Sequence, residues 1–345
     1  MIFGICFPKD EKKLNGFILY IKRELKKYKA AYYLETAMGI YDILDNNLDV
    51  RNIIARATLA AKQCKGQYMI HEARYTEELR AKIIREQNII NEMEHALETG
   101  EFVVYFQPKY ELDHCRPSGA EALVRWIRKD GTMIYPDRFI PVFEKNGFCA
   151  QLDLHMVELV CQMQRKWLDM GKEIVPISVN QSKLLFYQED YIERLCEITD
   201  RYGISRKYIV LEILEGLAAE NLDDLNHTIF RLKELGFQIS MDDFGSGYSS
   251  LRMLLQYPSS IIKLDRSLVR EMAQSTAKMH FIQSIVFACH QFGKTVCMEG
   301  VESAEQNEMI RNTGCDMIQG YYHYRPMELS QMYHLVSQTG SGETG

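Results

Sequence analysis

The 345-residue sequence lacks several features that would assign it to a protein class at once. No apolar run reaches the roughly 18 residues that span a bilayer, and the opening MIFGICFPKDEKK meets charge too soon for a signal peptide. The nine cysteines include no C-x-x-C pair and the nine histidines no H-x-x-x-H pair, which argues against a disulfide framework and a Cys/His zinc site. We therefore expect reduced thiols, a cytoplasmic location and no membrane insertion by this chain.

A broad basic surface is also missing. Lys and Arg number 41 against 47 Asp and Glu, and the formal charge of −6 argues against binding to a nucleic-acid polymer. The charge is uneven, because residues 1–100 carry +2 and residues 101–345 carry −8. A hydrophobic fraction of 46% with only 8 prolines is ample for a packed core, and the length suits two domains or one large domain with an appendage.

The first 75 residues alternate between short apolar runs and helical patterns. Residues 2–7 and 36–41 are predicted strands, and residues 14–25 and 49–64 are predicted helices, the second capped by Asp49. Two short strands cannot build a stable sheet, so this segment is predicted to be part of a domain.

A long helix is predicted over residues 76–98. Thr76 is its expected cap, Glu77 and Glu78 lie in its first turn, and Ile83 and Ile90 fall seven residues apart. Two interpretations remain open: the helix packs one stripe on its neighbours, or it is a linker that pairs with a second protomer and transmits a signal.

From residue 101 the pattern changes to short strands rich in β-formers that alternate with helices. Eight strands within about 220 residues predict the α/β class and a closed (β/α)8 barrel. The segments are FVVYFQ (102–107), GAEALVRW (119–126), VPISVN (175–180), YIVLEI (208–213), QISMDDF (238–244), SIIKLD (260–265), TVCMEG (295–300) and CDMIQG (315–320).

Polar residues occur at or near the carboxyl ends of seven of these strands. They are Glu121, Asn180, Glu212, Asp242 with Asp243, Lys263 with Asp265, Glu299 and Gln319. In a barrel these ends open on one face, so the side chains are expected to meet. Carboxylates held so close would repel one another unless their pKa values rise or divalent cations lie among them. The candidate ligands are all oxygens, which favours Mg²⁺ or Mn²⁺.

Adjacent aspartates suit a centre with two metal ions, since one carboxylate could bridge both ions. Asp242 and Asp243 have this arrangement, and such a pair typically activates water for attack at phosphorus. Lys263 is then expected to orient the nucleophile or offset developing charge, the alternative being a simple pair with Asp265.

Three further features near the strand ends are candidates for ligand contacts. Gln107 offers an amide, and Arg125 is either a phosphate clamp or stacks on Trp126. The glycine-rich DFGSGYSSL (243–251) has no lysine at the spacing of a P-loop, so Gly245 and Gly247 are predicted to permit a mobile turn beside the site.

These residues resemble the EAL-domain family of cyclic di-GMP phosphodiesterases, whose signature matches Glu121-Ala122-Leu123. The resemblance covers residues 101 to about 330, with the motifs in the family's order: YFQPKY, EALVRW, SVNQS, LEILEG, DDFGSGYSSL, IIKLDRSLV, MEGVES and IQGYY. It implies a modified TIM barrel with one antiparallel strand, an EAL domain over residues 101–335, and hydrolysis of cyclic di-GMP to linear pGpG.

The resemblance also implies a role for each matching residue. Glu121, Glu299 and Lys263 would be catalytic, with Lys263 placing the water. One metal ion would be held by Glu121, Asn180, Glu212 and Asp242, and the second would be attended by Asp242, Asp243 and Glu299. Glu215 would anchor the DFGSG loop, and the substrate would contact Gln107, Leu123, Arg125, Asp265 and Gln319. No metal or lysine position departs from the pattern, which favours catalysis over the alternative, a silent cyclic di-GMP receptor.

Residues 1–75 are similar to the C-terminal half of a GGDEF domain, through FGICFPKDE, ETAMGIYDI, LDVRNIIARATLAAK and KGQYMIH. The GGDEF signature itself is not in the chain, so no cyclase activity is expected, and the chain is predicted to be a fragment of a larger sensor. Residues 76–100 would be a linker helix and residues 336–345 a disordered tail. EAL domains commonly dimerise near the DFGSG loop, so the resemblance implies a homodimer through the EAL domain.

Overall fold

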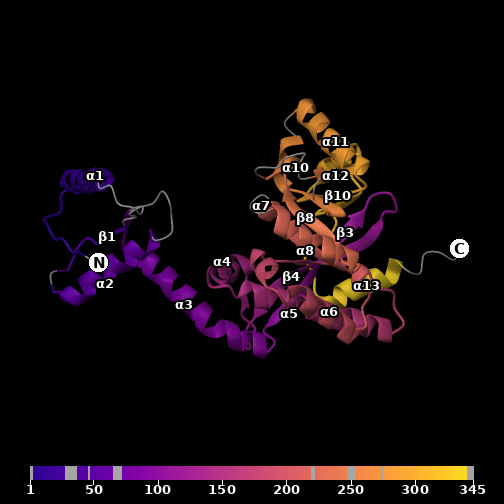
Figure 1. Ribbon diagram of the computed structural model, residues 1–345, viewed down its shortest axis with the longest axis horizontal. Helices are drawn as coiled ribbons and strands as arrows, with labels where there is room; N and C mark the ends of the chain where they lie inside the picture. The colour runs from indigo at the N-terminus through magenta and orange to yellow at the C-terminus, as the bar shows by residue number, and fades with distance from the viewer. Residues whose placement is uncertain are drawn as a thin grey trace. The chain divides into compact units, whose positions relative to one another are not determined.

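The computed structural model describes residues 3–27, 37–45, 47–64, 72–218, 222–246, 254–255, 257–272 and 275–339. Residues 247–251 of the glycine-rich loop, the KGQYMIH segment (65–71), Ile2, Thr36 and the end of the tail (340–345) lie outside these ranges, so the predictions made for them stay predictions. The chain divides into two compact units, Met1–Asn91 and Glu92–Gly345, and the division falls within helix α3 (Figure 1).

The first unit contains both predicted helices, α1 (Glu11–Lys27) and α2 (Val50–Gln63). Its strands β1 (Met38–Ile40) and β2 (Glu72–Arg74) pair in parallel with each other. The predicted cap of α2 is confirmed, because the Asp49 side chain accepts a hydrogen bond from the Arg51 amide.

The prediction of a strand over residues 2–7 was wrong for the described part of that segment. Residues 3–10 have no regular structure, and Phe3 and Ile5 leave 79% and 63% of their surface exposed. A strand is stable only when a neighbour satisfies its backbone groups, and the strands described in this unit pair only with each other. Apolar composition was therefore not enough to form a strand here.

Helix α3 (Glu77–Glu98) confirms the long helix predicted from periodicity. Thr76 caps it, since its Oγ1 accepts from the Leu79 amide at 3.1 Å. No helix in the described part of the chain is both long and apolar enough to cross a membrane.

All eight predicted barrel strands are present in the second unit. They are β3 (Phe102–Glu111), β4 (Arg116–Ile127), β6 (Ile177–Asn180), β7 (Ile209–Leu214), β8 (Gln238–Phe244), β9 (Ile261–Leu264), β10 (Thr295–Glu299) and β11 (Met317–Gln319). They pair in the order β3-β11-β10-β9-β8-β7-β6-β4, and pairing of β3 with β4 closes the barrel. Strand β3 runs antiparallel to both neighbours and the other barrel pairs are parallel, which confirms the modified TIM barrel.

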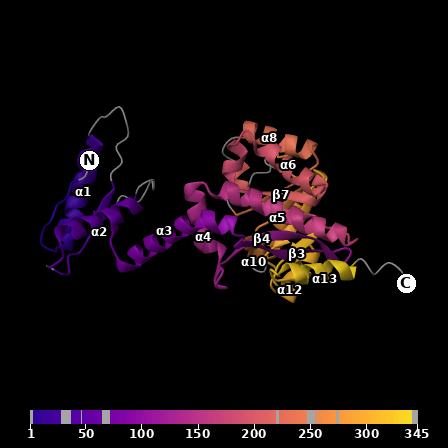
Figure 2. The same cartoon turned by 90° about the horizontal axis from the view of Figure 1, so that it is seen from below.

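Helices surround these strands in Figures 1 and 2, and all but the last of them lie between two strands in the sequence. They are α4 (Pro136–Asn146), α5 (Cys149–Asp169), α6 (Tyr191–Tyr202), α7 (Glu215–Ala218), α8 (Leu222–Glu234), α10 (Arg266–Met272), α11 (Thr276–Gln291), α12 (Ala304–Arg311) and α13 (Leu329–Thr339). The long interval before β6 holds α4, α5 and a two-residue strand, β5 (Met133–Ile134), which adds to the edge of β4.

An aromatic cluster anchors the ribbon formed by β3 and β4. Trp126 at the end of β4 packs against Phe102 of β3 and against Phe139 and Phe143 of α4, with ring centroids 5.0–6.1 Å apart. All four side chains are almost fully buried. Each such burial contributes about 1.5–3 kcal/mol, so the ribbon has a rigid attachment at the end where β4 reaches the barrel mouth.

Asp153 of α5 is a half-buried acid whose titration we expect to affect stability. Its Oδ2 accepts from the Ser182 amide at 2.7 Å, and burial raises its pKa from 3.8 to about 7 despite that hydrogen bond. A carboxyl whose pKa is higher in the folded state loses stability as the pH rises through this interval. Asp153→Asn should therefore stabilise the protein by about 2–4 kcal/mol at pH 8 and clearly less at pH 5.

Urea unfolding at the two pH values measures this effect. Asp169→Asn on the same helix is the matched control, because the Asp169 carboxylate is exposed and pairs only with Arg165 among the described residues. An equal gain for Asp153→Asn at both pH values would contradict the assignment.

Candidate active site

Glu121 joins four strands at the centre of the barrel. Its Oε1 accepts from Asn180 Nδ2 on β6 at 2.9 Å, and its Oε2 accepts from Gln319 Nε2 on β11 at 2.6 Å. Lys263 Nζ on β9 lies 3.0 Å from the same Oε2. With 6% of its surface exposed, Glu121 is held inside the barrel by three donors.

Lys263 carries the central charge of this cluster. Its ammonium lies 2.7–3.1 Å from carboxylate oxygens on four strands, those of Glu121, Glu212, Asp242 and Glu299. Burial alone would lower its pKa, but the four carboxylates outweigh this effect and raise the pKa well above its ordinary value. Lys263 is therefore a charged lysine although only 1% of its surface is exposed.

The alternative pairing of Lys263 with Asp265 was wrong. Asp265 follows β9, and its carboxylate accepts from the Ser267 amide at 2.9 Å, at the start of α10. Residues two apart in a strand point to the same face, which is why Lys263 and Asp265 were expected to pair. Strand β9 ends at Leu264, however, and Asp265 lies where the chain turns into the helix.

Glu212 lies between two lysines, one of which the sequence pattern did not reveal. Lys109 Nζ lies 2.7 Å from Glu212 Oε1 and donates to Ser178 Oγ at 2.5 Å, while Lys263 Nζ takes Glu212 Oε2 at 2.8 Å. Burial would raise the pKa of Glu212, but the two ammonium groups hold it at about 2. Glu212 is therefore ionised throughout the neutral range.

The sequence pattern predicts a strand that ends before Pro108, so Lys109 is not among the predicted site residues. Strand β3 instead continues to Glu111, and Pro108 lies opposite Ala120 of β4. Because β3 is antiparallel, Lys109 lies deeper in the barrel than Gln107, beside Gly119 and two positions below Glu121. The sequence did offer one indication of this position: Gln107 and Lys109 are two residues apart, so they point to the same face if the strand continues through Pro108.

Asp242, Asp243 and Glu299 form the acidic group nearest to a metal site. One ligand oxygen from each residue lies within 4.8 Å of the others. Burial raises the pKa of all three carboxyls, and neighbouring carboxylates add to the effect, whereas Lys263 opposes it. Their charge is therefore only partly compensated by the protein itself.

A local break in the strand explains how two consecutive aspartates share one site. Consecutive residues of a regular strand point to opposite faces. Asp243, however, has φ +56°, and the pairing of β8 with β9 shifts register between Met241 and Phe244. Such an irregularity re-aims a side chain, so Asp243 joins Asp242 in the acidic group.

The cluster as a whole has five carboxylates and two lysines, which leaves an excess of negative charge. The carboxylates are Glu121, Glu212, Asp242, Asp243 and Glu299, and the lysines are Lys109 and Lys263. The acidic group near Asp242 offers only carboxylate oxygens, the donors that hard divalent cations prefer. Both the charge and the donor set therefore fit a divalent metal ion.

The predicted ligand contacts lie along the β3–β4 ribbon and at the end of β11. Gln107 Nε2 donates to the Tyr324 carbonyl at 3.2 Å, and Gln319 Nε2 lies 3.3 Å from Gln107 Oε1. Leu123 and Arg125 follow Glu121 at alternate positions of β4, so all three share its inner face.

Arg125 does not stack on Trp126, so that interpretation of this arginine was wrong. Its guanidinium lies 5.4 Å from the centre of the Tyr105 ring, while Arg128 occupies the position near Trp126. Burial lowers the pKa of Arg125. A partly desolvated guanidinium beside the acidic cluster is a strong donor for a phosphate oxygen.

Glu215 holds the start of the glycine-rich loop. Its Oε2 accepts from the Gly245 amide at 3.2 Å, and its side chain is buried. Gly245 has φ +97°, and a Cβ there would come within 2.8 Å of Leu268 Cδ1, so only glycine suits this position.

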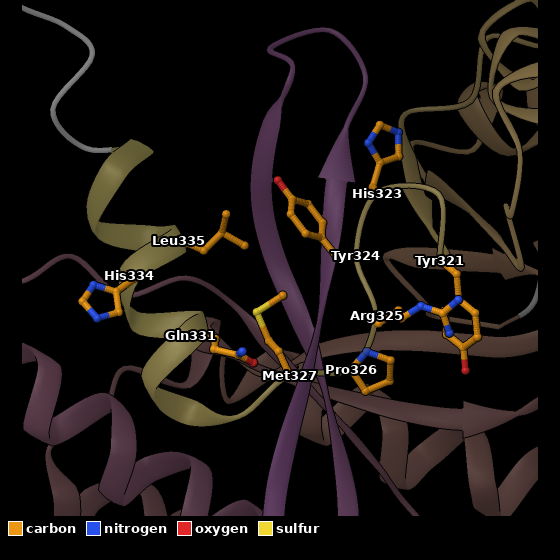
Figure 3. A pocket seen from close by; sticks show the side chains of 9 residues that line it. All are labelled: Tyr321, His323, Tyr324, Arg325, Pro326, Met327, Gln331, His334 and Leu335. Atoms are coloured by element: carbon orange, nitrogen blue, oxygen red, sulfur yellow. The ribbon is translucent and has the colours of Figure 1, made fainter.

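A separate open hollow of about 740 Å³ lies on the segment between β11 and α13 (Figure 3). Its nine lining residues all fall within 321–335, including Tyr324 and Arg325 from the segment and Gln331 from α13. The acidic residues do not line it, so this hollow is distinct from the cluster described above.

Comparisons with known proteins place this barrel in a family. A family model described as the EAL domain matches residues 90–326, more than half of the chain. MucR of Pseudomonas aeruginosa, a bifunctional diguanylate cyclase/cyclic di-GMP phosphodiesterase, is 31% identical over 249 residues, which are 72% of this chain and 36% of MucR. The cyclic di-GMP phosphodiesterase NbdA of the same species is 29% identical over 299 residues, 87% of this chain and 38% of NbdA. The chain thus spans well under half the length of these curated relatives.

Solved structures agree with this match. The MucR phosphodiesterase in complex with cyclic di-GMP has a TM-score of 0.66 at 31% identity, covering 71% of this chain and 99% of that one. The FimX EAL domain of Pseudomonas aeruginosa bound to cyclic di-GMP has a TM-score of 0.64 at 21% identity, which shows the shared fold alone. From the family match and the barrel that carries it, the chain belongs to the EAL-domain family of cyclic di-GMP phosphodiesterases.

Proposed function

We propose that this chain hydrolyses cyclic di-GMP to linear 5′-pGpG with the help of two divalent cations, Mg²⁺ or Mn²⁺. The observation that carries the proposal is the acidic cluster around Lys263, in which carboxylates from four strands converge on one ammonium group. A receptor that only binds the dinucleotide would need the ligand contacts but not five carboxylates in one barrel. The complete acidic set therefore favours catalysis over the receptor alternative.

The proposed metal ligands divide into two overlapping sets. Glu121, Asn180, Glu212 and Asp242 would hold one ion, and Asp242, Asp243 and Glu299 would hold the other. When bound, such cations polarise a phosphodiester and make water more acidic. The pKa values of Asp242 and Glu299, raised by burial, are expected to fall when cations replace part of the missing positive charge.

The protein's own groups would bind the substrate and position the water. Arg125 is proposed to donate to a phosphate oxygen, and Gln107, Leu123, Asp265 and Gln319 to contact the dinucleotide. Lys263 would hold the attacking water through a hydrogen bond. The water oxygen forms a bond to phosphorus while the P–O3′ bond breaks; the water gives up one proton and the leaving 3′ oxygen takes up one, so that the products are a 5′-phosphate and a 3′-hydroxyl. The ring opens once, which gives pGpG.

Incubation with cyclic di-GMP tests this proposal. We expect pGpG to appear in the presence of Mg²⁺ or Mn²⁺, to be absent when EDTA removes the metal, and to return when metal is added back, all followed by chromatography. Tight binding of cyclic di-GMP with no product at any protein concentration would support the receptor alternative instead. Since the barrel is proposed to form a homodimer, the assay should cover a range of protein concentrations.

The remaining assignments are proposals about the surroundings of the barrel. Residues 1–75 are proposed to be GGDEF-like without cyclase activity, residues 76–100 a linker helix and residues 101–335 the catalytic domain. The disordered tail predicted over residues 336–345 is proposed only for residues 340–345, because helix α13 continues to Thr339. The chain is proposed to act in the cytoplasm as part of a larger bacterial sensor. This N-terminal segment is proposed to be a small partial α+β unit, and the paired strands β1 and β2 with the capped helix α2 support the presence of both kinds of element.

A further inference from the structure

Lys109 is a buried cation in the barrel that the proposed reaction does not yet use. Only 3% of its surface is exposed, and its ammonium has two hydrogen-bond acceptors, Glu212 Oε1 and Ser178 Oγ. An ammonium group buried this deeply is costly unless it has a charged partner, and Glu212 is that partner. Lys109 is therefore tied to one carboxylate oxygen.

The reversed direction of β3 is what places Lys109 there. In a strand parallel to its neighbours, the residue two positions after Gln107 would lie further out toward the mouth. Here it lies opposite Gly119, below the level of Glu121, and reaches Ser178 and Glu212 across the barrel. The antiparallel strand thus supplies a cation from beneath the acidic cluster.

The two lysines that hold Glu212 are not equivalent. Lys263 has three other carboxylates within 3.1 Å, so it can leave Glu212 Oε2 and remain compensated. Lys109 has no other carboxylate among its contacts in the described part of the chain, so it cannot leave Oε1 without becoming a buried unpaired charge. Oε2 is therefore the oxygen that Glu212 can release to another cation.

We propose that Lys109 is a positioning residue that keeps Oε1 of Glu212 occupied, so that Glu212 offers only Oε2 to the metal site. The inference rests on the proposed function, because it concerns how a proposed ligand is presented. Without Lys109, Glu212 could turn or offer both oxygens, and the metal would be held in a different geometry. Residues that orient ligands in this way typically change metal affinity or activity by about 10–100-fold when removed.

Lys109→Met tests the inference in the full chain loaded with Mn²⁺. We expect kcat for cyclic di-GMP to fall by about 10–100-fold, while KM changes by less than about threefold. The electron paramagnetic resonance spectrum of bound Mn²⁺ should also differ from that of the wild type, because the ligand geometry changes.

Lys294→Met is the matched control. Lys294 is a buried lysine with a hydrogen-bonded ammonium, as Lys109 and Lys263 are, but its acceptors are neutral: the carbonyls of Tyr257 and Ser259 and the Ser259 hydroxyl. Its variant should keep the wild-type Mn²⁺ spectrum and kcat. Should Lys109→Met not fold, Ser178→Ala removes one acceptor of Lys109 without a change of charge and should lower kcat in the same direction, by a smaller factor.

Wild-type kcat and an unchanged Mn²⁺ spectrum in folded Lys109→Met would overturn the inference, as would a rise in KM with kcat unchanged. A wild-type chain that yields no pGpG would instead count against the proposed function. The Mn²⁺ spectra of wild type and variant would still decide, in that case, whether Lys109 positions a metal ligand.

Discussion

Glu121→Ala is expected to reduce pGpG formation by more than about 100-fold at saturating Mn²⁺, because it removes a proposed metal ligand rather than a residue that merely orients one. Three donors converge on this carboxylate: Asn180, Gln319 and Lys263. Their loss of a common acceptor would also disturb the alignment of the remaining ligands. Chromatography of the reaction products measures the effect.

The fold is expected to survive this substitution. Lys263 keeps three carboxylate partners, and one negative charge leaves the surroundings of Asp242 and Glu299, whose pKa values are already raised by burial and by neighbouring carboxylates. Glu158→Ala is a suitable control, because Glu158 accepts from Arg201 and Tyr202 on α6 and has no part in the cluster. Rates close to wild type in Glu121→Ala would refute the metal assignment.

The location of the acidic cluster was predictable from the sequence because strand ends in a barrel meet at one face. Polar residues at the ends of short apolar runs are easy to recognise, and Glu121, Glu212 and Glu299 do converge on Lys263. The eight strands were recognisable for the same reason, since each is a short apolar run between helices.

The cluster's inner contacts were less predictable, because they depend on strand direction and register. Lys109 lies after Pro108, a residue that usually ends a strand, and it enters the barrel only because β3 is reversed. The partners of Asp265 were also missed, since they depend on where β9 gives way to α10. For residues 3–7 the prediction of a strand was wrong. Their apolar pattern suits a strand, but a strand forms only where a neighbouring strand pairs with it.

Lys263→Met should lower the unfolding free energy in EDTA by about 3–5 kcal/mol, because it leaves buried carboxylates without their shared cation. It should also abolish measurable pGpG formation. The pKa of Lys263 is raised in the folded protein, so the ammonium stays charged across the neutral range. Lys263 therefore contributes to stability at every pH below the ordinary pKa of a lysine, 10.5. The variant loses this contribution under all such conditions.

The loss should grow with pH, and its sign follows from the carboxyl groups. Burial raises the pKa of Asp242 and Glu299 above the unfolded values of 3.8 and 4.5, so these groups destabilise the fold as they ionise. Without Lys263 their pKa values rise further, and ionisation at pH 8 costs more than at pH 5. Thermal melts in EDTA at both pH values should show a larger deficit at pH 8.

Added Mn²⁺ should recover part of the stability of Lys263→Met, because a divalent cation replaces the missing positive charge and binds only the folded state. Lys294→Met loses a buried lysine whose acceptors are neutral, so its deficit should respond to Mn²⁺ no more than wild type does. If Lys263→Met melted like the wild type in EDTA, or responded to pH and Mn²⁺ only as Lys294→Met does, the carboxylates would not depend on Lys263 for their charge balance. A deficit in EDTA that grows with pH and is partly recovered by Mn²⁺ would show that Lys263 balances the charge of the acidic cluster in the absence of metal.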